Sequence, residues 1–163
     1  MGSDPNSHPA ILAAVRRHGT VDIGLRVAGL GMAATTGTLV GFGIRRGAPM
    51  LVLSAAGDRL RGLPAFVAPD RSFGASAFVG LAHHLALAAA WAFVFTFLAV
   101  PLRGAARTVV ALLLATIAVS ADRLLPPWLC LAAGVASTPQ RALLALALCA
   151  ALVMGMRLAQ RME

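Results

Sequence analysis

Two adjacent histidines, His83 and His84, interrupt an otherwise apolar stretch that reads GLAHHLALAAAW from residue 80 to residue 91. Imidazole ligates haem and related macrocycles, and it also serves as a general acid or base near neutral pH. Trp91 follows about two helical turns later, where an indole could form one wall of a pigment pocket. His83, His84 and Trp91 are therefore the candidate cofactor-binding residues, for a single chlorophyll-type pigment or a haem.

The rest of the chain provides few partners for catalysis or metal binding. The other two histidines, His8 and His18, lie near the amino terminus, so one bundle cannot easily hold a bis-histidine haem. Cys130 and Cys149 stand nineteen positions apart with no zinc-type spacing around them, and we interpret them as small hydrophobic residues. Because GxSxG elbows, phosphate-binding glycine loops and acidic pairs are also missing, we expect no catalytic residues, no metal site and no enzymatic activity.

The composition indicates a membrane protein. Hydrophobic residues make up 59% of the 163 residues and charged residues only 12%, against about 25% in an ordinary soluble domain. All fourteen basic residues are arginines, and they stand at the ends of apolar segments, with no basic face interleaved with aromatic residues. Lipid phosphate is thus the expected counterion for the net charge of +8, and nucleic acid is not an expected partner. The alanine, leucine, glycine and arginine bias is typical of GC-rich bacteria, which predicts a multi-pass protein of the bacterial inner (cytoplasmic) membrane.

Four apolar segments are candidates for spans, which need roughly 20 residues each. They cover residues 27–44, 73–102, 105–125 and 138–156. The second is longer than a bilayer requires and is expected to tilt or protrude, whereas the third and fourth are the shortest between charges. The fold class predicted is an all-α integral membrane protein: one antiparallel four-helix transmembrane domain over residues 27–163, preceded by an N-terminal segment over residues 1–26.

Three shorter segments are predicted to lie at the membrane surface. Residues 9–17 and 49–60 have apolar side chains along one helical face, and residues 128–135 contain a tryptophan suited to the headgroup level. Residues 103–107 are long enough only for a tight turn between antiparallel helices. The segments on the two faces of the membrane carry seven arginines each, so the positive-inside rule leaves the orientation open.

Small side chains recur every four residues in the first predicted span, at Gly29, Ala33, Gly37 and Gly41. Lipid gives helices no hydrophobic drive to associate, so close backbone approach along such a stripe is a main source of packing energy. We expect this small-residue stripe to pack inside the bundle, with a contact to another subunit as the alternative.

Aromatic pairs at a spacing of four residues occupy two faces of the second predicted span. Trp91 pairs with Phe95, and Phe93 pairs with Phe97. Bundle packing and lipid contact explain these pairs, although a pigment or quinone pocket uses the same residue types.

Depth in the membrane suggests partners for the histidines. Counted from the turn near residue 104, His84 lies about twenty residues away along one helix and Asp122 about eighteen along the next. Ionisable groups at membrane depth normally find partners. We therefore predict a polar cluster of His83, His84, Asp122, Arg123 and Arg141 near one membrane face, the alternative being histidines that reach interfacial water.

Three resemblances bear on function. The patterns V79xxxH83xxxL87 and G80xxxH84xxxA88 resemble the surroundings of the pigment-binding histidine in bacterial light-harvesting polypeptides, which have a single span. Membrane desaturases carry several HxxHH-type boxes, and this chain has one bare HH pair. In size, span order and composition the chain resembles the small, uncharacterised four-helix inner-membrane proteins of bacteria.

The sequence contains few residues suited to catalysis and several helix faces suited to packing, and this combination favours a non-catalytic role. The function predicted first is an accessory or scaffold subunit of a larger membrane complex, with other membrane-protein subunits and the bilayer as partners. A pigment- or haem-binding subunit that uses His83 or His84 is the second possibility. The third is an oligomeric carrier of a small solute or ion, although the spans lack the internal breaks and repeats that transporters often display.

Overall fold

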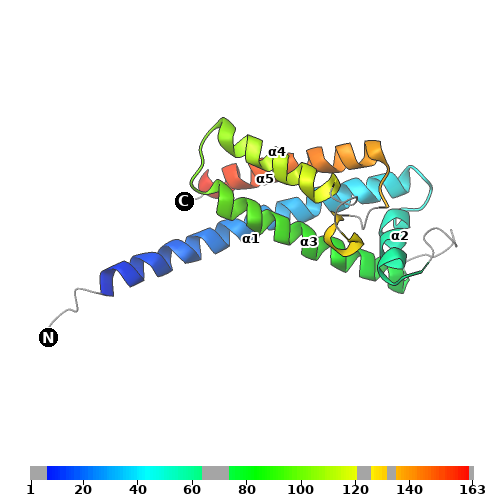
Figure 1. Ribbon diagram of the computed structural model, residues 1–163, viewed down its shortest axis with the longest axis horizontal. Coiled ribbons are helices and arrows are strands. Elements are labelled where there is room, and N and C mark those ends of the chain that lie inside the picture. The colour runs from blue at the N-terminus through cyan, green and yellow to red at the C-terminus, as the bar shows by residue number, and fades with distance from the viewer. Residues whose placement is uncertain (1–6, 64–73, 121–125, 132–134, 162–163) are drawn as a thin grey trace.

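The described part of the chain is entirely helical (Figure 1). The computed structural model describes residues 7–63, 74–120, 126–131 and 135–161, with side chains from residue 19 onward except that of residue 127. The helices are α1 (Ser7–Ile44), α2 (Leu51–Leu60), α3 (Ala75–Ala99), α4 (Ala105–Ser120) and α5 (Thr138–Arg161). A 3₁₀ turn, η2 (Pro127–Leu129), lies between α4 and α5. The all-α prediction is confirmed.

Helix α1 packs along both α3 and α5 and runs antiparallel to each. On the α3 side, Gly24 lies against the ring of Phe93, and Thr35 is hydrogen bonded to His84. On the α5 side, Gly155 lies against Val27. Since both neighbours run opposite to α1, α3 and α5 run parallel to each other.

Helix α4 completes the arrangement by packing mainly on α5 and also on α3. Its connection to α3 is as short as predicted: α3 ends at Ala99, α4 begins at Ala105, and Gly104 supplies a positive φ of 57° in the turn. The side chain of Arg107 closes the turn, donating from one terminal nitrogen to the Leu102 carbonyl and from the other to Gln160 on α5.

Alanines line the inner faces of α3 and α4, which brings these helices close to their neighbours. A methyl group fills little space, so the backbones approach and their van der Waals contacts multiply. Larger side chains of the core come from α5, as Leu144, Leu148 and Leu152, and also from the other helices, as Leu39 of α1 and Phe95 of α3. The fully buried alanines are Ala88, Ala92 and Ala99 of α3 and Ala111, Ala115 and Ala118 of α4.

Three helical segments are long and apolar enough to cross a membrane: Gly19–Ile44, Ala75–Ala99 and Thr138–Arg161. The chain is therefore a membrane protein. Helix α3 has 25 residues, or about 37 Å at 1.5 Å per residue, which exceeds the roughly 30 Å of a hydrocarbon core. Helix α4 has only 16 residues, about 24 Å, so it falls short of the usual spanning length. The last five residues of the predicted third span, 121–125, lie outside the described residues.

The expectation of a separate surface helix over residues 9–17 is wrong. Helix α1 runs without interruption from Ser7 to Ile44, and its N-terminal part projects beyond the other helices (Figure 1). No proline follows Pro9 within the helix, and Gly19 and Gly24 are not sufficient to break it. The N-terminal segment is thus continuous with the first long helix.

Residues 49–60, predicted to form a helix at the membrane surface, contain α2, which is more buried within the protein than the prediction implied. Seven consecutive residues of α2, from Val52 to Asp58, are buried, and the helix packs against the first half of α3. Protein therefore covers α2 on most sides, and its position at the membrane surface stays a prediction. In the segment 128–135, Trp128 is 59% exposed whereas Cys130 and Leu131 are buried, and the predicted position at the membrane surface stays a prediction.

Candidate functional site

The paired histidines lie in the first half of α3 but point to different neighbours. His84 is 1% exposed, and its Nε2 atom lies 2.9 Å from the Thr35 hydroxyl of α1. That hydroxyl donates its own proton to the Gly31 carbonyl at 2.8 Å, one turn back in α1. Thr35 can therefore only accept from His84, which places a proton on Nε2 of the imidazole.

His83 connects α3 to the segment that follows α4. Its Nε2 atom lies 2.7 Å from the Trp128 carbonyl oxygen, and a carbonyl oxygen can only accept. Nε2 of His83 therefore also carries a proton. One helical position thus separates a histidine that bonds to α1 from a histidine that bonds to the η2 turn.

These bonds leave neither histidine a free Nε2 lone pair for an iron or magnesium ion. The Nδ1 atoms of both histidines are buried and have no hydrogen-bond partner among the described residues. The Nε1 atom of Trp91 is also buried and also has no partner among them. Among the residues that the structure describes, no group of three or more histidine, cysteine or acidic side chains could hold a metal ion. The arrangement fixes helices to one another more readily than it binds a macrocycle.

The structure describes only some residues of the predicted polar cluster. Asp122 and Arg123 lie outside the described residues. Arg141 is on the first turn of α5, where its Nε atom donates to the Ala136 carbonyl at 2.8 Å. The described hydrogen bonds of His83 and His84 lead to other residues, and the cluster with Asp122 stays a prediction.

The small-residue stripe of α1 lies on the outside of the molecule, so the expectation that it packs inside the bundle is wrong. Gly29, Ala33 and Gly37 are exposed, and a Cβ atom added at Gly29, Gly37 or Gly41 would meet nothing within 4 Å. Helix α1 buries a different series of residues, offset by two positions. That buried series is Gly31, Thr35, Leu39 and Gly43.

A shallow apolar groove runs beside the exposed stripe, between α1 and α3, with a volume of about 450 Å³. Ala33 and Gly37 form part of it, and the Thr36 hydroxyl there has no hydrogen-bond partner among the described residues. The residues that line the groove are Met32, Ala33, Thr36, Gly37 and Val40 of α1 with Leu81 and Leu85 of α3.

A buried polar contact between α2 and α3 was not expected from the sequence. Asp58 of α2 is 7% exposed and accepts a hydrogen bond from the hydroxyl of Ser76, the second residue of α3. Arg61 donates in turn to the Ser76 oxygen at 2.9 Å. The carboxylate therefore sits at the positive end of the α3 dipole, where Gly74 offers no side-chain cap.

Glycines make this contact possible. An added Cβ at Gly57 would collide with the Ser76 carbonyl oxygen, and one at Gly80 would collide with the Leu53 carbonyl oxygen. The two helices thus touch backbone to backbone. The spacing of Ser76 and Gly80, small residues four apart, was the signal available in the sequence.

Comparison of the chain with protein-family models, curated proteins and solved structures found no match.

Proposed function

We propose that this protein is a non-catalytic accessory or scaffold subunit of a larger bacterial membrane complex. The observation that carries the proposal is the exposed small-residue stripe of α1, beside the groove between α1 and α3. Small residues at an interval of four residues allow another transmembrane helix to approach the backbone closely. Along most of this stripe the chain's own helices leave the space open. The expected occupant is a transmembrane helix of a different subunit.

The chemistry of the groove also supports a packing role. Its walls are almost entirely apolar, and the Thr36 hydroxyl is the one polar group among its described lining side chains. Such a hydroxyl can rotate to accept or donate across a helix interface, which is worth about 0.6 kcal/mol on average in membranes. The histidines contribute by joining α3 to α1 and to η2, which keeps the two walls of the groove in register.

The experiment is purification of the full chain from its native membrane in mild detergent, with the size of the complex measured by native electrophoresis. The wild type should migrate with partner subunits. Gly37→Leu should release it, because the leucine occupies the space a partner backbone needs, while the variant itself stays folded. Ala86→Leu is the matched control: this residue is also exposed but lies on α3 outside the groove, so the complex should persist.

Two outcomes would overturn the proposal. The first is a chain that purifies alone as a stable homo-oligomer whose size is unaffected by Gly37→Leu. The second is solute or ion transport by the purified chain after reconstitution. A photo-crosslinker at Ala33 provides an independent check, since it should form one adduct of defined mass with a partner subunit.

We further propose that α4 crosses the membrane as a fourth span. Because α3 and α5 run parallel, the end of α3 and the start of α5 are at opposite ends of the bundle, and the intervening chain must cross. Arginines at both ends can snorkel and so extend a short helix. Topology reporters inserted after Gly104 and after Ser137 should then report opposite sides of the membrane. Reporters on the same side would contradict a fourth span.

A further inference from the structure

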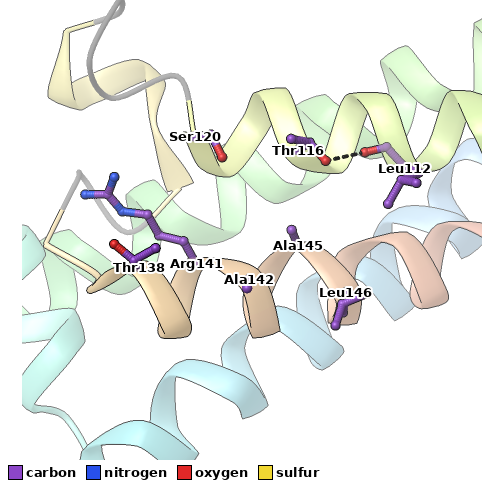
Figure 2. A pocket seen from close by; sticks show the side chains of 8 residues that line it. All are labelled: Leu112, Thr116, Ser120, Thr138, Arg141, Ala142, Ala145 and Leu146. Carbon is purple, nitrogen blue, oxygen red and sulfur yellow. Dashed lines mark hydrogen bonds between the residues drawn. The ribbon is translucent and has the colours of Figure 1, made fainter.

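A second groove lies on the opposite part of the molecule, between α4 and α5, and has a volume of about 650 Å³ (Figure 2). Its lining residues are mostly exposed, so it is open to the surroundings of the bundle. Because these helices belong to a membrane protein, lipids surround the bundle and can enter such a groove. The question is whether the lining selects one lipid over another.

The groove is polar at one end and apolar at the other. Ser120 is the last residue of α4 and Thr138 the first residue of α5, and these hydroxyl side chains lie at the same end of the groove (Figure 2). Leu112 and Leu146 lie eight residues away on the two helices, at the apolar end. Eight residues of helix correspond to about 12 Å. This gradient matches a lipid whose headgroup sits at the helix ends and whose acyl chain extends toward the membrane centre.

A positive charge stands at the polar end. The guanidinium of Arg141 lies beside Thr138, and its Nε atom is held by the Ala136 carbonyl at 2.8 Å (Figure 2). The N-terminus of α5 adds a positive helix-dipole end at the same place. Arg45 and Arg46, at the end of α1, line a neighbouring pocket with Ser137, so this face of the bundle is basic.

We propose that the α4/α5 groove is a binding site for one anionic phospholipid of the phosphatidylglycerol type. The phosphate is held by Arg141 with the hydroxyls of Ser120 and Thr138, and one acyl chain lies along Leu112 and Leu146. Arginine suits this task because its planar fork can pair with two phosphate oxygens. Basic pockets between transmembrane helices are a known basis for headgroup selection. The inference is independent of the scaffold role, because it concerns another face of the molecule.

The test is native mass spectrometry of the purified full chain with phosphatidylglycerol or with phosphatidylcholine of identical acyl chains. We expect one phosphatidylglycerol per chain to be retained at least fivefold more strongly than phosphatidylcholine. Arg141→Gln should remove that preference, and Arg141→Lys should keep part of it because the charge stays. Leu146→Trp, at a 59% exposed position, should weaken both lipids by filling the apolar end. Arg157→Gln, an exposed arginine near the other end of α5, is the matched control and should change nothing.

Equal retention of the two lipids, or a preference that survives Arg141→Gln, would overturn the proposal. Displacement of the lipid by inorganic phosphate at equal concentration would do the same, because it would assign the site to a free anion. A dimer that disappears with Leu146→Trp, without any change in lipid binding, would assign the groove to a second copy of the chain.

Discussion

Glycines mark two regions of this molecule, and the two regions behave in opposite ways. Where α2 meets α3, Gly57 and Gly80 bring two backbones into contact, and no side chain fits between them. On the outer face of α1, Gly29 and Gly37 have open space where a side chain would lie. The residue type is the same, and the spacing of small residues along the helix is similar.

The difference shows that small residues permit a close approach without producing one. At the α2/α3 contact, a second attraction exists: the Asp58 carboxylate accepts from Ser76 at the N-terminus of α3, and Arg61 donates to the same hydroxyl. Charge-assisted hydrogen bonds of this kind fix the position and orientation of a helix. On the outer face of α1, the ion pair between Asp22 and Arg26 joins two residues of the same helix, and the space beside Gly29 and Gly37 remains open.

The largest effect expected from this comparison is that of Gly80→Leu. The new side chain must displace the Leu53 carbonyl of α2, and overpacking of this kind costs about 3 kcal/mol in the free energy of unfolding. Thermal or denaturant unfolding in detergent measures the loss. Gly80→Leu with unchanged stability would contradict the backbone contact between α2 and α3.

A smaller loss is expected for Ser76→Ala, which tests the polar half of the same contact. The buried Asp58 carboxylate loses the hydroxyl that donates to it, which costs about 1–3 kcal/mol. The measurement is again the free energy of unfolding in detergent. Thr108→Ala, at an exposed position of α4, is the control and should stay within about 0.5 kcal/mol of the wild type.

The hydrogen bond between His84 and Thr35 should contribute less to the free energy of unfolding than the hydrogen bond between Ser76 and Asp58. Thr35→Val keeps the shape of the side chain but removes the acceptor for His84 Nε2, and interhelical hydrogen bonds in membranes are worth about 0.6–1.7 kcal/mol. Thr35→Ser retains the hydroxyl, so it should retain more of the hydrogen-bond contribution than Thr35→Val. Equal stability of the valine and serine variants would contradict the proposed role of the hydroxyl as acceptor.

The smallest effect on the free energy of unfolding is expected in the exposed small-residue stripe of α1. Gly37→Leu should cause no loss in the free energy of unfolding of the isolated chain, because nothing lies within 4 Å of the added Cβ and leucine has a higher helix propensity than glycine. Unfolding in detergent, with Gly80→Leu measured beside it, makes the contrast direct. A loss similar to that of Gly80→Leu would mean that the two regions do not differ.

The amino-acid sequence predicted the all-α fold and most helix positions, because the apolar runs and the flanking arginines follow directly from residue type. The helix boundaries agree well at the start of α4 and α5, residues 105 and 138, and the tight turn before α4 is confirmed. The candidate site was harder to predict. His84 was recognised as a residue that needs a partner, but its described partner is Thr35, forty-nine positions earlier in the chain.

The sequence by itself determined that the chain is helical and apolar enough to enter a membrane, since these properties are sums over individual residues. Only the tertiary structure decided which face of each helix is covered. A stripe at Gly29, Ala33 and Gly37 and a buried series at Gly31 and Thr35 differ by a rotation of α1 about its own axis. Small residues occur in both series, so the local sequence does not determine which series is buried. Contacts with α3 and α5, which are distant along the chain, determine it.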